Sequence, residues 1–238
     1  MNLVLIRIFI FSLLPLIIGG FQIVLDSSTN TRLRRLEVIL IYLFALGVAG
    51  SGIGGFISHF FISDIVAESI GWDTGSPFQL EVAFANLAIG ILGLVAVSRR
   101  DGFREATVIT VTVFGVGATI VHLMDIFASG NLSPGNTFQN IANLVRPALL
   151  IGFLIASRRQ EGSTGSEAET IEFDIWRQPR LQAAGWMTAC VASAFGFGFA
   201  VDQAWLATLL GVVFGSGIVT LVISRSPAEA RQAFPQGN

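Results

Sequence analysis

Five ionisable side chains lie within otherwise apolar segments of this chain or at their ends: His59, Glu81, His122, Asp125 and Arg146. Ionisable groups are costly at bilayer depth, and membrane proteins that keep them there generally use them. His122 and Asp125 are three residues apart, so a helix places them on one face. Imidazole and carboxylate groups in such a setting bind metal ions or cofactors, or carry protons.

Each of these residues also has a purely structural interpretation, and the sequence leaves both open. His59 can simply lie at the water interface. Arg146 can serve only to neutralise Glu81 or Asp125, because buried charges are normally paired. His122 and Asp125 can form a hydrogen-bonded pair that fixes helix packing. The spacing matches no metal motif, since the chain has neither HExxH nor a repeated Glu-x-x-His.

The composition is typical of a membrane protein. Hydrophobic residues make up 53% of the 238-residue chain and charged residues 13%, against about 25% charged in soluble domains. All 14 basic residues are arginine, so neither a retinal Schiff base nor pyridoxal phosphate has the lysine that it needs. The net charge of −2 gives no reason to expect nucleic acid. A single cysteine, Cys190, excludes an internal disulfide.

Apolar segments recur along the chain. A helix needs about 20 apolar residues to cross the hydrocarbon core, and seven segments approach that length: residues 3–24, 38–61, 82–97, 106–127, 141–156, 181–200 and 205–223. The arginines outside these segments fall in alternate loops and in the tail, which places the N-terminus outside and the C-terminus in the cytoplasm. We therefore expect an all-α, polytopic transmembrane helix bundle of about seven spans in the inner (plasma) membrane.

This pattern predicts four regions. Residues 1–36 form the first transmembrane helix and a basic cytoplasmic loop, and residues 37–157 form a four-helix bundle that carries the polar site. Residues 158–180 form a flexible acidic linker, and residues 181–238 form a transmembrane hairpin and tail. The alternating directions of the spans bring all five ionisable side chains to the outer half of the second to fifth helices.

Small residues predict close helix contacts near this site. Gly47, Ser51 and Gly55 repeat at four-residue spacing on the second apolar segment and lead to its histidine. Such a stripe allows a neighbouring helix to approach closely. On the fifth segment, Pro147 leaves the carbonyl of Asn143 without its helical donor. We expect that carbonyl to point into the same outer region.

Several motifs resemble a known family. They are AESIGW at residues 67–72, GSPFQLEVAFANLAIG at 75–90, the His122-x-x-Asp125 pair and PGN at 134–136. They resemble an uncharacterised family of small four-helix bacterial integral membrane proteins, itself distantly DoxX-like, over about residues 37–156. The family resemblance implies a site at the matching positions, which are Glu68, Glu81, Asn86, His122, Asp125 and Asn136.

Three functions are consistent with the sequence. The first is an outer-facing His/carboxylate pocket that holds a metal ion, a quinone or a haem, with the two histidines as possible axial haem ligands. The second is a proton-linked small-molecule transporter. Two features count against it: the sequence has no clear internal repeat, and the inner half of the spans has no polar residues. The third is a non-catalytic accessory subunit that docks a membrane protein partner or a second copy of itself. We favour the first, without assigning catalysis. Its candidate ligands are His59, Glu81, His122 and Asp125, supported by Glu68, Asn86, Asn136, Asn143 and Arg146.

Overall fold

The computed structural model describes residues 3–25 and 31–164, and these residues form helices joined by short connections. In chain order the elements are α1 (Leu3–Ile8), the π-helix η1 (Phe9–Leu13), α2 (Leu14–Leu25), α3 (Arg32–Tyr42), the π-helix η2 (Leu43–Gly50), α4 (Ser51–Phe61), α5 (Ser63–Ile70), α6 (Phe78–Ser98), α7 (Gly102–Ser129), α8 (Pro134–Thr137) and α9 (Gln139–Thr164). The predicted sixth and seventh spans, and the linker beyond residue 164, lie outside the described residues.

Within residues 3–25 and 31–164, five helical segments are long and apolar enough to cross a membrane: Val4–Leu25, Arg32–Phe61, Phe78–Ser98, Gly102–Ser129 and Pro134–Gly162. They correspond to the first five predicted segments. The third begins at Phe78 rather than at residue 82, directly after Pro77. The hydroxyl of Ser76 accepts a hydrogen bond from the Phe78 amide at 3.4 Å. The fifth continues past its predicted end at residue 156, so Arg158 and Arg159 lie on α9.

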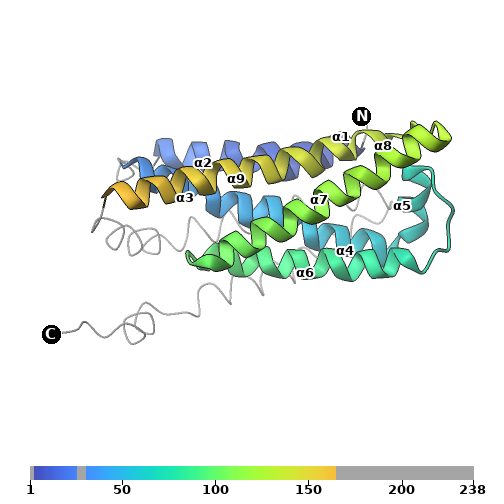
Figure 1. Ribbon diagram of the computed structural model, residues 1–238, viewed down its shortest axis with the longest axis horizontal. Helices are drawn as coiled ribbons and strands as arrows, with labels where there is room; N and C mark the ends of the chain where they lie inside the picture. Colours follow the sequence, from blue (N-terminus) through green and yellow to red (C-terminus); the bar gives the residue numbers. More distant parts are fainter. Residues whose placement is uncertain (1–2, 26–30, 165–238) are drawn as a thin grey trace.

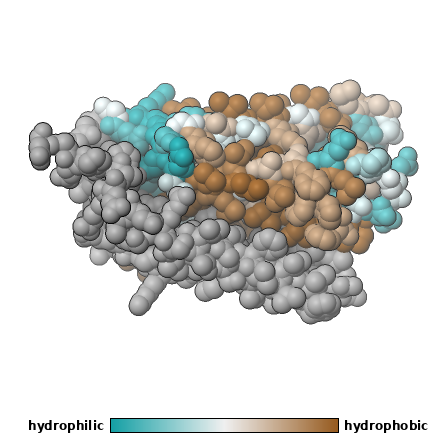
Figure 2. Space-filling model, turned by 90° about the horizontal axis from the view of Figure 1, so that it is seen from below, coloured by the Kyte–Doolittle hydropathy of each residue, from teal (hydrophilic) through white to brown (hydrophobic). Residues whose placement is uncertain are grey.

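Consecutive spans run in opposite directions along the long axis of the molecule (Figure 1). The connections formed by residues 62–77 and 130–138 meet at one end, which we call the pocket end. Residues 99–104 and 157–161 meet at the other, which we call the arginine end. Figure 2 shows hydrophobic side chains in a band between hydrophilic groups at both ends of the coloured part of that face. This distribution is the one that a bilayer requires.

Glycines set the close contact between α4 and α6. A Cβ at Gly52 would lie 2.5 Å from the backbone nitrogen of Gly90, and one at Gly55 would lie 2.7 Å from the side-chain oxygen of Asn86. Contacts this short require the absence of a side chain. The predicted stripe is therefore confirmed at Gly55, while Gly47 packs against a different neighbour, the backbone of Phe11.

The first span packs within the bundle through its π-helical segment. η1 contacts η2, and a Cβ at Gly47 would lie 3.2 Å from the carbonyl oxygen of Phe11. π-helical turns redirect side chains and are frequent at functional sites. Arg7 precedes η1 and Ser51 follows η2 directly, and both side chains face the cavity described below.

A buried ion-pair network closes the arginine end. The carboxylate of Glu37, which is 1% exposed, contacts Arg104 at 2.8 Å and Arg100 at 3.1 Å. It also accepts the hydroxyl hydrogen of Ser157 at 2.6 Å. The network joins α3, α7 and α9. A carboxylate and a guanidinium thus lie buried at this end and satisfy each other. Both residues fall outside the predicted spans, so the expectation that the inner half of the spans has no polar residues stays a prediction.

Candidate functional site

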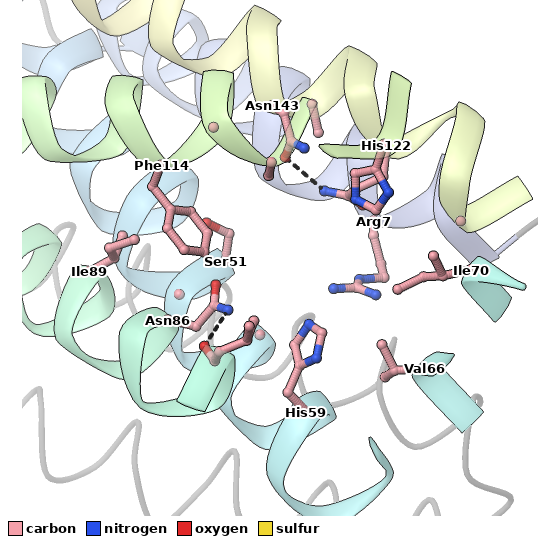
Figure 3. Close-up of a pocket in the computed structure, with 18 of the residues that line it drawn as sticks. Arg7, Ser51, His59, Val66, Ile70, Asn86, Ile89, Phe114, His122 and Asn143 are labelled. Carbon is pink, nitrogen blue, oxygen red and sulfur yellow. Dashed lines mark hydrogen bonds between the residues drawn. The ribbon is translucent and has the colours of Figure 1, made fainter. Parts of the chain in front are cut away.

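A cavity of about 500 Å³ lies between the helices at the pocket end. α1, η1, α4, α6, α7 and α9 all contribute to its walls. Its polar lining includes the side chains of Arg7, His59, His122, Asn143 and Arg146, and its apolar lining includes phenylalanine, isoleucine and valine side chains. Figure 3 shows the guanidinium of Arg7 projecting into the space between the two imidazoles.

Hydrogen bonds hold the imidazole of His122 in one orientation. Its Nδ1 lies 2.7 Å from the side-chain oxygen of Asn136. The amide nitrogen of Asn136 donates to Asp125 at 3.0 Å and to the carbonyl of Asn131 at 2.8 Å. Both amide hydrogens are thus used on oxygen acceptors, so the amide oxygen must face His122. The Nδ1 of His122 therefore carries a hydrogen, and in the neutral ring Nε2 is an acceptor.

Asp125 organises the connections above the cavity. Its carboxylate accepts hydrogen bonds from Trp72 at 2.9 Å, Asn131 at 2.7 Å and Ser129 at 2.9 Å, as well as the bond from Asn136. The indole of Trp72 stacks on His122 with ring centroids 5.3 Å apart and planes inclined by 23°. The carboxylate thus positions both rings that border the cavity, without lining the cavity itself.

Glycine makes this arrangement possible at the end of α5. Gly71 has φ +82°, the left-handed conformation common at helix C-termini. A Cβ at Gly71 would lie 2.4 Å from the hydroxyl of Ser133 and 2.7 Å from the side chain of Asn131. The side-chain amide of Asn131 donates to the carbonyl of Ile70 at 2.9 Å. The turn before Trp72 is therefore packed directly against the α7–α8 connection.

His59 enters the cavity from α4. Its Nδ1 lies 2.5 Å from the side-chain oxygen of Gln79 on α6. An imidazole that donates through Nδ1 to an amide oxygen has its Nε2 free to accept. Both histidines are thus anchored through Nδ1 by amide side chains.

The two arginines of the cavity have a different environment. Arg7 comes from α1 and Arg146 from α9, and they are close enough for their charges to interact. The Nε of Arg146 is buried without a hydrogen-bond partner. Among the described residues neither guanidinium takes part in an ion pair. The predicted neutralisation of Arg146 by Glu81 or Asp125 is therefore wrong.

The structure brings together most of the predicted site residues. Those that line the cavity are His59, Asn86, His122, Asn143 and Arg146. Asn136 is fully buried behind His122. The carbonyl of Asn143 faces α7 at Gly115, where a Cβ would lie 2.5 Å from it, and Gly115 also lines the cavity.

Three predicted carboxylates lie outside the cavity. Glu68 and Glu81 are exposed, and Asp125 is held by the connections. Residues on a helix advance by about 100° each, so Glu81 lies about 200° from Gln79 and nearly opposite it. α6 turns Gln79 and Asn86 inward, which carries Glu81 to the outer surface. Within the described residues no cluster of three or more His, Cys, Asp or Glu side chains could hold a metal ion.

Sequence reasoning missed Arg7, Gln79 and Trp72. Arg7 is the only charged residue of the first apolar segment, and this isolation is the signal that could have found it. Trp72 fits an interfacial aromatic belt, which conceals its stacking on His122. Gln79 carries no charge, so a search for ionisable residues selects Glu81, two positions further on, and passes over Gln79.

Comparison with known proteins places the chain in a family. No curated protein and no solved structure matches it. A family model described as a family of unknown function, DUF6790, matches residues 6–163. The match is wider than the range of 37–156 expected from the motifs and takes in the first helix. It covers more than half of the sequence, so the chain belongs to the DUF6790 family of unknown function.

Proposed function

We propose that this protein is an integral membrane protein that binds a small lipophilic molecule in the cavity at its pocket end. The observation that carries the proposal is the cavity itself, which combines a volume of about 500 Å³ with a polar interior and apolar walls. Sites for small molecules typically have about 300–1,000 Å³ and a few converging polar groups on an apolar lining.

The exposed apolar part of the cavity lining favours a ligand that enters from the bilayer. Three of the apolar lining residues are at least half exposed: Phe78 at 57%, Val113 at 67% and Val121 at 50%. These side chains belong to α6 and α7, whose outward faces are apolar. A lipid-soluble molecule can pass between them without crossing a polar surface.

The polar lining favours a ligand whose head accepts hydrogen bonds. Arg7 and Arg146 offer guanidinium hydrogens, and Gln139 and Asn143 offer side-chain amides. Among the ligands considered from the sequence, a quinone has such a head on an apolar body. A haem held by both histidines would need the space into which Arg7 projects (Figure 3). A bare metal ion would lack carboxylate ligands here.

The orientation that we propose follows from the loop arginines. Residues 99–104 and 157–161 bring five arginines to the arginine end, which the positive-inside rule assigns to the cytoplasm. The cavity then opens in the outer half of the plasma membrane.

Two matched substitutions test the proposal. Gly117 lines the cavity and Gly152 does not, and a Cβ at either meets nothing within 4 Å. Small molecules are extracted from the purified wild-type, Gly117→Phe and Gly152→Phe proteins and identified by mass spectrometry. Binding of added decylubiquinone is measured from quenching of Trp72, with the other three tryptophans replaced by phenylalanine. We expect Gly117→Phe alone to lose ligand. Equal results in all three proteins would refute the proposal.

A further inference from the structure

Two positive charges share the cavity, and none of the described residues gives them an acidic partner. The guanidinium groups of Arg7 and Arg146 come from different helices and repel each other. Among the described residues that line the cavity there is no aspartate or glutamate. A buried charge that has no partner of opposite sign is costly. The described part of the cavity therefore has a surplus of positive charge.

The acidic residues of the pocket end either accept hydrogen bonds from other groups or lie outside the cavity. Asp64 accepts a hydrogen bond from the Gly75 amide at 3.1 Å, and Asp125 accepts four hydrogen bonds outside the cavity. The remaining three, which are Glu68, Asp73 and Glu81, are exposed and do not line it. No carboxylate among the described residues is available to neutralise the two arginines.

Arg104 shows how the same fold treats an arginine that is purely structural. Its Nη1 pairs with Glu37 at 2.8 Å, its Nε donates to the carbonyl of Ala96 at 3.1 Å, and its guanidinium lies over the ring of Phe44. Its Nη1, its Nε and one face of the guanidinium thus each have a protein partner. Arg146 has a buried Nε without one. The contrast indicates that the partner of Arg146 lies outside the described residues.

We propose that Arg7 and Arg146 together bind the anionic head group, a carboxylate or a phosphate, of the lipophilic molecule in the cavity. This inference rests on the proposed function and names the ligand class. Guanidinium groups match both oxyanions through paired hydrogen bonds. The apolar part of the molecule lies along Phe11, Ile89 and Phe114, which line the same cavity.

The test compares ligands that share one tail. Binding is measured by competition against radiolabelled decanoate, using the full-length protein in phosphatidylcholine nanodiscs. The competitors are decyl phosphate, 1-decanol and decylubiquinone. On the wild-type protein we expect decanoate or decyl phosphate to bind about tenfold or more tightly than 1-decanol, because hydrogen bonds to charged groups are the stronger ones. The acid that binds more tightly identifies the head group.

Variants locate the head group. Arg7→Gln and Arg146→Gln should each weaken binding of the preferred acid by about tenfold or more and leave 1-decanol nearly unchanged. Arg99→Gln is the control, because Arg99 is half exposed, pairs with Asp101 and lies at the arginine end. Arg146→Lys keeps the charge and should retain part of the affinity.

Two results would overturn the inference: equal affinity of wild type for decanoate, decyl phosphate and 1-decanol, or acid binding that survives both glutamine substitutions. If decylubiquinone still bound and Gly117→Phe abolished that binding, the proposed function would stand while the anionic head would not. If no probe bound, both would fall. The wild-type comparison requires no variant to fold.

Discussion

His122 is anchored by an amide, and this decides what its imidazole can do. The side chain of Asn136 lies between His122 and Asp125 and hydrogen-bonds to both. The carboxylate of a catalytic triad both orients its imidazole and stabilises the charged form of the ring. A neutral amide orients the ring but does not supply the negative charge. With Nδ1 engaged by Asn136, Nε2 is the ring nitrogen left for a ligand in the cavity. The arrangement suits ligand binding better than proton relay.

The tautomer can be observed directly. The chain has 2 histidines, so ¹⁵N-histidine labelling gives a spectrum that one His59→Gln variant assigns. At pH 7.5 we predict the Nδ1-protonated tautomer for His122. In Asn136→Ala the oxygen acceptor is gone, and we expect His122 to become a mixture of tautomers while His59 keeps its signals. A wild-type ring protonated on Nε2 would contradict the assigned network.

Some site residues could be predicted and others could not, for a geometric reason. Knowing the direction of each span fixes depth, and depth alone correctly grouped His59, His122 and Arg146. It does not fix rotation about the helix axis. α6 is apolar around most of its circumference, so no pattern told which way Glu81 points. Arg7 was missed because the first helix was assigned to a separate region.

At the scale of elements, glycines determine how closely α4 and α6 approach. Gly52 faces the backbone of Gly90, whereas a Cβ at Gly54 would only touch the end of the Phe11 ring at 3.7 Å. The sequence indicated a small-residue stripe on this helix but placed it one position away from the tightest contact. The exact register depends on the partner helix, which a single sequence does not identify.

Alanine substitutions at these two glycines should have opposite effects. Gly52→Ala forces the helices apart, and we predict a loss of about 1–3 kcal/mol in the free energy of unfolding. Gly54→Ala has room for its methyl group and should be neutral or stabilising by up to about 1 kcal/mol. Unfolding in mixed micelles measures both. Similar destabilisation by the two substitutions would show that the α4–α6 contact is looser than described.

At the scale of the molecule, five predicted spans form one bundle with chemically different ends. The arginine end is closed by ion pairs around Glu37. The described pocket end is held by hydrogen bonds from neutral donors, including those to the carboxylates of Asp64 and Asp125. The apolar segments predicted the spans because hydrophobic length is a one-dimensional property. The division of polar groups between the ion pairs of one end and the cavity of the other appears only when the helices are packed.

Single cysteines test which end faces outward. In a Cys190→Ser background, Asp73→Cys reports on the pocket end and Arg99→Cys on the arginine end; both positions are exposed. With intact cells and a membrane-impermeant maleimide, we predict labelling at residue 73 only, and labelling at residue 99 after permeabilisation. The reverse pattern would place the cavity in the inner half of the membrane.

The central claim is that the cavity arginines serve a ligand, whereas Arg104 serves the fold. Its most direct test is the thermal stability of ligand-free Arg146→Met and Arg104→Met in the same detergent. Arg104→Met removes an arginine that pairs with the buried carboxylate of Glu37, and it should lower the free energy of unfolding by about 3–5 kcal/mol. Arg146→Met removes an uncompensated charge and should unfold at the wild-type temperature or above it. If Arg146→Met were destabilised as strongly as Arg104→Met, Arg146 would be part of the structural framework and the account would be wrong.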